Sequence, residues 1–535
     1  MKKLLHIFAV AGMLLAAGCA GGSIAVAPAA AVTIAAPTAA TPEPVQSSPA
    51  DSKGVPWAAW PTRAWEVASP EQVGMDSSRL LTLIDFLPKR GLDLHSLLVI
   101  RRGYIVFEVN TFPNQVSSGQ ELQSCTKSIT SILTGIALKD GLLHSTDQKV
   151  LDFFPDRTFA NLDDRKREMT VRDLLTMTTG LTWPEATLSY GSRDNPVRAM
   201  WSGSDPVQYI LNQPMSAAPG AVFNYNTGAS QLLGAIIEKN SGQKLAAYAK
   251  QQLFNPLGIR DFSWHKMRGI EPGGSGLVLT ARDMAKLGYL YLRGGQWENH
   301  QLIPPAWVNE STRQQVEAGA HGSYGYQWWL GPGGSYSAIG FGGQAIHVYP
   351  DKDLVVVITG AMSQTQRTSL HNLVDYFVVP AVVSDQPLPE TDDTRELQLR
   401  LKSASDRPTP QAVTPLPAVA QEIAGRSYTL ETNPLYWAKF KLDFSENEAL
   451  LTVTKTNGNT HRIPVGLDGV PRLQESLYTV VEGDWDAERT FTFHYEMLGD
   501  ADGRTIKMVF EGSQVTLTST TYVQADIVQF KGQAQ

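Results

Sequence analysis

Cysteine and excess positive charge are both scarce in this 535-residue chain. Its two cysteines are Cys19 and Cys125, so a disulfide framework, a cysteine-based zinc site and an iron–sulfur cluster are excluded. Acidic residues outnumber basic ones, and the formal net charge is −7. Because phosphate backbones are bound through clustered lysine and arginine, nucleic acid is not an expected partner. No group of histidine and carboxylate residues has metal-ligand spacing, so we expect neither a metal nor another cofactor.

The N-terminus has the pattern of an export signal. Lys2 and Lys3 precede an apolar run that is too short to span a membrane, and small residues follow it. Residues 14–19 resemble a bacterial lipobox, in which the cysteine becomes the lipidated first residue of the mature chain. We therefore predict a lipoprotein signal peptide over residues 1–19, and an exported protein held to the outer membrane, facing the periplasm, by acyl chains on Cys19. An ordinary signal peptide that contains a cysteine by chance is the alternative.

Composition divides the rest of the chain into four parts. Residues 20–61 are rich in alanine and proline, with almost no large apolar residue before Trp57, which predicts a flexible tether. Residues 65–383 carry regular apolar patterning. Residues 384–417 are dense in proline, aspartate and threonine and are interpreted as a linker with a short helix over 394–403. Residues 418–535 alternate apolar and polar side chains between turn clusters, which predicts a small all-β domain.

The block 65–383 mixes helical and strand periods. Apolar residues recur at helical spacing over 129–136, 232–237 and 284–292, and Gly141 follows the first of these as a helix-ending residue. Segments 97–100, 104–107 and 354–358 are rich in β-branched residues, and Arg101-Arg102-Gly103 is a turn that would join the first two into a hairpin. We predict an α+β fold in which helices cover an antiparallel sheet.

A serine and a lysine one helical turn apart are the first chemical signal. Ser124 stands at the expected start of a helix and Lys127 lies at i+3, on the same face. A serine hydroxyl needs such a neighbouring base to act as a nucleophile, and the helix N-terminus favours a developing alkoxide. Ser241 with Lys244, and Ser263 with Lys266, have the same spacing but no helix-start signal.

Further motifs give this pair its context. The segment 124–127 is followed in order by residues 169–181, by Pro219-Gly220 with Tyr225, and by Gly340-Phe341-Gly342-Gly343. This ordered set resembles the serine hydrolases related to class C β-lactamases and penicillin-binding proteins, in particular the branch of 6-aminohexanoate-dimer hydrolases and family VIII esterases. The resemblance covers about residues 65–383. It implies the β-lactamase/transpeptidase-like fold, in which an antiparallel sheet is flanked by a helical region.

The resemblance also implies roles for individual residues. Ser124 would be the acylated nucleophile, Lys127 its partner in proton transfer, and Tyr225 the group that relays a proton to the leaving group. The backbone amides of Ser124 and Gln344 would bind the oxyanion. Since a phenol ordinarily has a pKa near 10, Tyr225 would need a neighbouring cation such as Lys127 to work as a base.

Two departures from the family pattern bear on the substrate. Thr227 stands where asparagine is common, two residues after Tyr225. Phe341-Gly342-Gly343 occupies the place of the Lys-Thr-Gly of β-lactam-processing relatives, so a cation that would bind a substrate carboxylate is lost. Trp183, Tyr190, Trp328 and Trp329 are candidate walls of an acyl pocket, although aromatic residues at this density are at least as often core.

We therefore expect a serine hydrolase that cleaves small-molecule esters or amides through an acyl-enzyme. A β-lactamase or D-amino-acid peptidase is one alternative. A catalytically inactive binding protein of the cell envelope is another, although binding alone does not require serine, lysine and tyrosine together.

Overall fold

The structure, a computed structural model, describes residues 55–535. The predicted signal peptide, Cys19 and most of the predicted tether lie outside the described residues. Lys53–Gln535 forms one compact unit, which contains both the patterned block and the C-terminal β domain. In the described part of the chain, no helix combines the length and the apolar character needed to cross a membrane.

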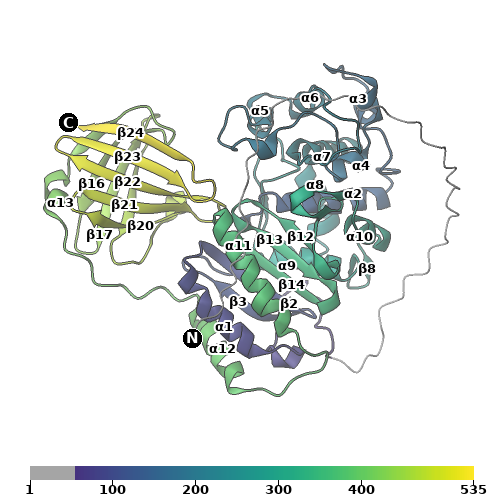
Figure 1. Ribbon diagram of the computed structural model, residues 1–535, viewed down its shortest axis with the longest axis horizontal. Helices are drawn as coiled ribbons and strands as arrows, with labels where there is room; N and C mark the ends of the chain where they lie inside the picture. The colour runs from purple at the N-terminus through teal and green to yellow at the C-terminus, as the bar shows by residue number, and fades with distance from the viewer. Residues whose placement is uncertain (1–54) are drawn as a thin grey trace, which may run out of the picture. The chain divides into compact units, whose positions relative to one another are not determined.

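A nine-stranded sheet forms the centre of the patterned block (Figure 1). Only β1 and β3 pair in parallel; the other neighbours are antiparallel. The predicted hairpin is confirmed, since β2 and β3 pair through a turn that contains Arg102 and Gly103 at positive φ. The strands in spatial order are β1 (Glu66–Val67), β3 (Tyr104–Asn110), β2 (Leu94–Arg101), β14 (Leu354–Gly360), β13 (Ala345–Tyr349), β12 (Tyr336–Ile339), β11 (Trp329–Leu330), β10 (Ser323–Tyr324) and β9 (Val316–Glu317).

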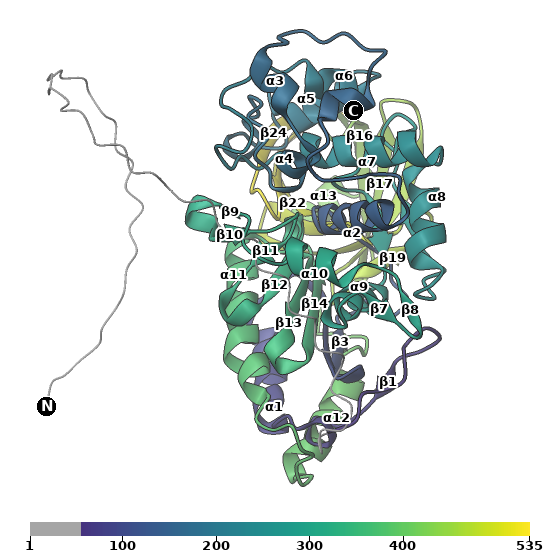
Figure 2. The ribbon, with the colours of Figure 1, turned by 90° about the vertical axis from the view of Figure 1, so that its right-hand side faces the viewer.

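The central strands of this sheet carry apolar side chains on both faces, so both faces must be shielded from water, and helices pack on each of them. Successive side chains of a strand point to opposite faces, so Val355 and Val357 join one core while Val356 and Ile358 join the other. Figure 2 shows α11 and α9 on opposite sides of strands β12–β14. The helices next to the sheet are α1 (Ser77–Phe86), α9 (Ala281–Leu292), α11 (Gln364–Leu373) and α12 (Asp392–Ser403).

A helical region follows the first hairpin and carries most of the remaining helices. Its longest members are α2 (Cys125–Lys139) and α7 (Thr227–Ser241), which pack against each other. The α2 helix ends at Asp140 and Gly141, as its sequence predicts. The shorter helices are α3 (Asp164–Glu168), α4 (Val171–Leu175), α5 (Pro196–Ser202), α6 (Pro206–Leu211), α8 (Leu245–Ala249) and α10 (Pro305–Ser311). Short ladders join β4 (Gln120–Glu121), β6 (Leu277–Leu279) and β5 (Ser263–Trp264), and β7 (Gln296–Trp297) with β8 (His300–Gln301).

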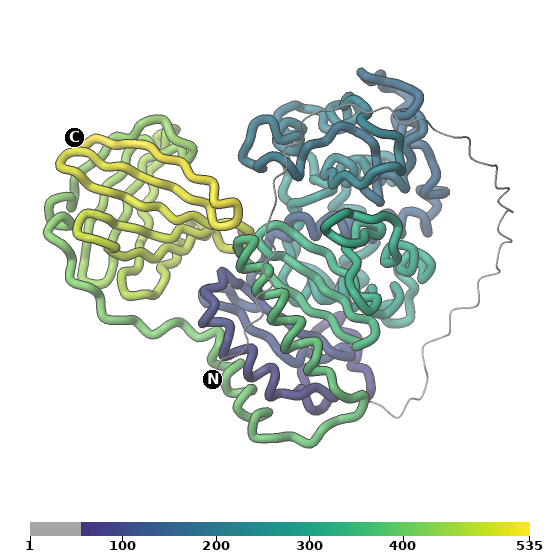
Figure 3. Tube along the Cα trace, in the orientation of Figure 1, coloured from purple at the N-terminus to yellow at the C-terminus, as the bar shows by residue number. Residues whose placement is uncertain are grey.

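The C-terminal strands form a closed barrel, which confirms the predicted all-β domain. From β15 to β18 and from β19 to β24, consecutive strands pair antiparallel as the chain winds back and forth (Figure 3). β24 returns to β15, and Gly466 of β18 pairs in parallel with Glu482 of β20 to complete the closure. The short helix α13 (Ala418–Ile423) precedes β15. The strands are β15 (Ser427–Leu430), β16 (Trp437–Phe444), β17 (Glu448–Lys455), β18 (Thr460–Gly466), β19 (Arg472–Gln474), β20 (Thr479–Ala487), β21 (Thr490–Met497), β22 (Gly503–Glu511), β23 (Gln514–Thr521) and β24 (Ile527–Ala534).

Two segments outside the predicted core domain pack against it. Helix α12 lies in the segment interpreted as a linker, yet it packs on α1 and buries Leu397 completely. At the end of the predicted tether, the Val55 amide donates to the Asp385 carbonyl, and Arg102 donates to the Val55 carbonyl. Apolar side chains in both segments therefore extend the layer that covers the sheet.

Candidate active site

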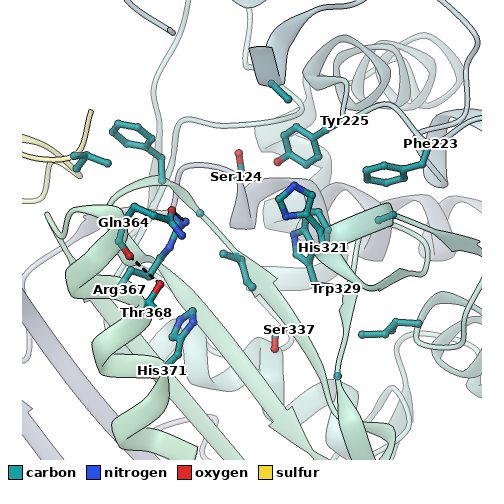
Figure 4. A pocket seen from close by; sticks show the side chains of 18 of the residues that line it. Ser124, Phe223, Tyr225, His321, Trp329, Ser337, Gln364, Arg367, Thr368 and His371 are labelled. Atoms are coloured by element: carbon teal, nitrogen blue, oxygen red, sulfur yellow. Dashed lines mark hydrogen bonds between the residues drawn. The ribbon is translucent and has the colours of Figure 1, made fainter. Parts of the chain in front are cut away.

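Ser124 lies at the N-terminal end of α2, on the wall of a cavity of about 890 Å³ (Figure 4). Its hydroxyl makes no capping bond to the helix, so the oxygen is available to the cavity. The preceding residue, Gln123, has a φ of 49°, a conformation that costs a non-glycine residue free energy. Such strain is tolerated when surrounding contacts hold the backbone, as the packing of α2 does here.

Lys127 lies one turn further along α2 and reaches Ser124. Its Nζ is 3.0 Å from Ser124 Oγ and donates to the carbonyl of Gly274 at 2.9 Å. The side chain is only 2% exposed. Burial lowers the pKa of Lys127 to about 8, although the charge of Glu185 opposes this shift. At pH 7 roughly a tenth of Lys127 is therefore neutral beside the serine hydroxyl, against less than about a thousandth for an ordinary lysine.

The other two serine–lysine pairs lack this arrangement. Ser241 is the last residue of α7, and its hydroxyl donates to the Ile237 carbonyl. Lys244 pairs instead with Glu238. Ser263 lies on the two-residue strand β5, and Lys266 pairs with Glu271. Local hydrogen bonds and ion pairs thus account for these residues.

Tyr225 approaches Ser124 from the segment that precedes α7 (Figure 4). Lys127 Nζ lies 5.1 Å from the centre of its ring, and the ring stacks on Trp329 with centroids 6.0 Å apart. Burial, and then the charge of Glu185, raise the pKa of Tyr225 well above that of an ordinary phenol. The expectation that Lys127 would turn this phenol into a base therefore does not match its surroundings. The two pKa shifts leave Tyr225 protonated near neutral pH, whereas Lys127 is partly neutral.

Thr227 does not take the place of the missing asparagine in the cavity. Its hydroxyl donates to Glu185 Oε1 at 2.6 Å, and its amide donates to Glu185 Oε2 at 2.7 Å. Glu185 is 1% exposed and also accepts hydrogen bonds from Trp183 and Tyr190. Glu185 could not be identified from the sequence, because it is a single glutamate at the start of a short 3-10 turn and lies at no characteristic spacing from Ser124, Lys127 or Tyr225.

The Phe341-Gly342-Gly343 segment forms a tight turn between β12 and β13 next to Ser124. Gly340 and Phe341 line the cavity, and a Cβ on Gly340 would lie 3.2 Å from the Ser124 amide nitrogen. Gly342 and Gly343 have φ values of 73° and 94°, which favour glycine. The turn therefore brings backbone close to the nucleophile without a side chain between them.

Gln344, proposed from the family as an oxyanion donor, lies behind this turn. It is fully buried and is absent from the cavity lining. Its side-chain amide donates to the carbonyls of Phe341 and Gly360 and accepts from the Gly360 amide. The Gln344 side chain therefore holds the turn to β14, and the assignment of its backbone amide as an oxyanion donor stays a prediction.

The remaining walls come from distant parts of the chain. Trp329 and Tyr190 line the cavity as predicted candidates, whereas Trp183 and Trp328 are core residues. Helix α11 contributes Arg367, Thr368 and His371, and the barrel loop between β23 and β24 contributes Val523 and Gln524. No aspartate or glutamate is among the lining residues, so the cavity wall carries no formal negative charge.

One further group near the site, Cys125, fits a structural role. Cys125 is fully buried, its thiol donates to the Gln344 carbonyl at 3.4 Å, and burial raises its pKa far above the usual value. It is thus a small core residue, as its position suggests. Across residues 55–535, no cluster of three or more histidine, cysteine or carboxylate residues could hold a metal ion.

Several known proteins are similar in sequence to parts of this chain. A lovastatin esterase from Penicillium rubens is 27% identical over 203 residues, which are 34% of this chain and 49% of the esterase. A 6-aminohexanoate-dimer hydrolase from Paenarthrobacter ureafaciens is 23% identical over 274 residues, which are 47% of this chain and 68% of that enzyme. The chain thus spans about half the length of the lovastatin esterase.

A solved structure has the same fold. It is a Bacillus anthracis protein, described provisionally as a 6-aminohexanoate-dimer hydrolase, with a TM-score of 0.50 and 19% identity over 63% of this chain and 92% of that one. The family model described as Beta-lactamase matches residues 95–376, more than half of the chain. This range contains the Ser124 site and confirms the resemblance inferred from the motifs. The chain therefore belongs to the Beta-lactamase family.

Proposed function

We propose that this protein is a serine hydrolase that cleaves esters or amides of small molecules through an acyl-enzyme on Ser124. The observation that carries the proposal is the contact of 3.0 Å between Lys127 Nζ and Ser124 Oγ at the edge of a large cavity. A buried amine with a pKa of about 8 is matched to accept a proton near neutral pH. Esterase and amide-hydrolase relatives support the same reaction class.

The proposed reaction begins with proton transfer from Ser124 to neutral Lys127. The serine oxygen then attacks the substrate carbonyl, and the carbonyl electrons move to its oxygen. We assign the binding of this oxyanion to the backbone amides of Ser124 and Gln344, as the family resemblance implies. Ser124 lines the cavity, and the Gln344 side chain holds the turn before its own amide by donating to the Phe341 carbonyl.

Breakdown of the tetrahedral intermediate needs a proton on the leaving group. Tyr225 carries a proton and faces Ser124, so it donates this proton to the departing oxygen or nitrogen and regains one from the Lys127 ammonium. Water then attacks the acyl-enzyme, with Lys127 as the base through Tyr225, and releases the acid. Each cycle consumes one water molecule and restores the resting protonation of serine, lysine and tyrosine.

Labelling with a fluorophosphonate probe tests this proposal directly. The wild type should be labelled on Ser124, and Ser124→Ala should lose both labelling and hydrolysis of p-nitrophenyl butyrate. Ser241→Ala is the matched control and should keep both, since its hydroxyl is bonded to the α7 backbone. An unlabelled wild type would support the non-catalytic binding protein instead.

A β-lactamase or D-amino-acid peptidase is the second candidate, and Arg367 is the observation that favours it. The residues that replace Lys-Thr-Gly supply no cation, but Arg367 on α11 brings one to the same cavity. Burial lowers the pKa of this guanidinium, which donates to the side-chain oxygen of Gln364 and forms no salt bridge among the described residues. A substrate carboxylate could therefore be bound there, although short esters remain the preferred substrates in our proposal because Phe341 adds apolar surface beside Ser124.

We also propose export and lipidation at Cys19, on the sequence pattern of residues 1–19 alone. Metabolic labelling with a fatty-acid analogue should tag the wild type but not Cys19→Ser, and the tag should follow the membrane fraction. An untagged mature chain that begins at another residue would leave only the export proposal standing.

A further inference from the structure

Glu185 is a buried carboxylate beside the candidate catalytic residues that the proposed reaction does not use. Its Oε2 accepts from the Trp183 indole at 2.7 Å and from the Thr227 amide at 2.7 Å. Its Oε1 accepts from the Thr227 hydroxyl at 2.6 Å and from the Tyr190 hydroxyl at 2.8 Å. Since two of these groups can only donate, they require a carboxylate oxygen without a proton.

These hydrogen bonds connect three segments of the site. Thr227 is the first residue of α7 and follows Tyr225 by two positions, so the two bonds to Thr227 hold the backbone next to the Tyr225 ring. Tyr190 lines the cavity and packs edge-on against Phe341 with ring centroids 6.1 Å apart. One carboxylate therefore fixes Tyr225 on one side and the wall formed by Tyr190 on the other.

The charge of Glu185 acts on the same groups. It raises the pKa values of Tyr225 and Tyr190, and it opposes the burial that lowers the pKa of Lys127. The other titratable group that acts on Lys127 is the Cys125 thiol, which stays neutral because burial raises its pKa. Glu185 is thus the carboxylate whose charge acts on Lys127 among the described residues. A Cβ on Gly274 would lie 2.9 Å from Thr227 Cγ2 and 3.3 Å from Lys127 Nζ, so Thr227, which donates to Glu185, lies beside the amine. A buried ammonium without such a partner would cost considerable free energy.

We propose that Glu185 is the positioning residue of this site: it holds Tyr225 and Tyr190 in place and supplies the counter-charge for Lys127 while that lysine carries the serine proton. The proposal rests on the proposed acyl-enzyme function. It also explains the departure at Thr227, because a threonine hydroxyl can donate to Glu185 while its amide does the same. The pair Glu185–Thr227 orders the start of α7 from within the protein, instead of presenting an amide to the substrate.

The charge effect has a definite sign. A nearby carboxylate favours the ammonium form of Lys127 and so raises its pKa. In Glu185→Gln the pKa of Lys127 should fall, and the neutral amine should form at lower pH. The rate of Ser124 acylation should rise with pH as Lys127 loses its proton, and we call this rising part of the pH–rate profile the acid limb. In Glu185→Gln the acid limb should move to lower pH. The maximal rate should fall as well, because Tyr225 and Tyr190 lose the carboxylate that holds them in place.

The experiment measures fluorophosphonate labelling rates from pH 5.5 to 9.5, together with kcat and KM for p-nitrophenyl butyrate. For Glu185→Gln we expect the limb to move down by about one pH unit, and kcat to fall by roughly 10–100-fold, in the range of one lost charge interaction. Trp183→Phe is the matched control, since it removes one hydrogen bond to the same carboxylate and keeps the charge. Its limb should coincide with that of the wild type.

Each result has a clear meaning. A labelled wild type with an unmoved limb in Glu185→Gln overturns the counter-charge role, and equal shifts in Glu185→Gln and Trp183→Phe reduce Glu185 to a structural residue. If Glu185→Gln does not fold, Glu185→Asp keeps the charge on a shorter side chain. It should then show a lower kcat with a limb near that of the wild type, and a wild-type kcat would contradict the positioning role. An unlabelled wild type would instead refute the proposed function itself.

Discussion

The catalytic region and the C-terminal barrel build their interiors from different residues. The barrel core consists of apolar side chains in strict alternation, such as Ala449, Leu451 and Val453 along β17. Around Ser124, by contrast, Lys127 and Glu185 are buried together with several hydroxyl groups. Burying a charge costs free energy unless the charge is paired and hydrogen-bonded, so a region that needed only stability would have an apolar core like that of the barrel. The buried charges around Ser124 therefore indicate that this region is built for a reaction at some cost in stability.

The largest expected effect comes from removing the buried amine. Lys127→Ala should lower kcat/KM for p-nitrophenyl butyrate by about 10²–10⁴-fold, the usual contribution of a general base. In the wild type, kcat/KM should rise with pH and reach half its plateau near pH 8, because only the neutral form of a lysine with a pKa of about 8 accepts the serine proton. A pH–rate profile on both proteins checks this, and a flat wild-type profile between pH 6 and 9 would contradict it.

Core substitutions in the two regions should separate stability from activity. Leu451→Ala in the barrel and Leu133→Ala in α2 both remove a fully buried leucine, and each should cost about 2–5 kcal/mol of unfolding free energy. Only Leu133→Ala changes the helix that carries Ser124, so the labelling rate of the folded protein should fall in that variant alone. Urea unfolding combined with fluorophosphonate labelling measures both quantities. Equal loss of labelling in the two variants would show that the barrel core also positions the site.

The cation on α11 should affect substrates that carry a carboxylate. Arg367→Gln should lower kcat/KM for nitrocefin by roughly 10–100-fold, equivalent to about 1.5–3 kcal/mol for a hydrogen bond to a charged group. The same change should leave p-nitrophenyl butyrate nearly unaffected. In the wild type, kcat/KM for the butyrate should exceed that for nitrocefin. The reverse ranking on one preparation, with Ser124→Ala as the blank, would favour the β-lactamase alternative.

The smallest effect tests a direct contact between the two regions. A Cβ on Gly342 would lie 2.1 Å from the Ala501 carbonyl in the turn between β21 and β22. Gly333 has a similar positive φ but no atom within 4 Å of its Cβ position, so it is the matched control. Both alanine variants should lose about 1–2 kcal/mol of stability from the left-handed backbone. Only Gly342→Ala should also lower kcat/KM, by about tenfold, because the turn at Phe341 must shift. Identical kinetics in the two variants would show that the barrel contact is not needed for turnover.

Elements whose signal is local could be predicted from the order of residues alone. Ser124 and Lys127 meet because residues three apart share a helix face, and the first hairpin follows from two β-branched runs around Arg102-Gly103. The barrel strands follow from alternation with turn residues between them. The ordered motifs also identified the family, and the placement of Tyr225 near Ser124 matches the expectation from that resemblance.

The distant groups that complete the site became apparent from the folded chain, not from any local pattern. Glu185 and Thr227 are 42 residues apart, and Lys127 and Gly274 are 147 apart, so no local period links them. The same holds for Arg367, which reaches the cavity because α11 packs along the sheet, and for Phe341, which faces the cavity while Gln344 turns inward. The physical reason is that burial and electrostatic coupling depend on distances in the folded chain. The protonation of Lys127 and Tyr225 is therefore a property of the fold, although the residues themselves stand in the sequence.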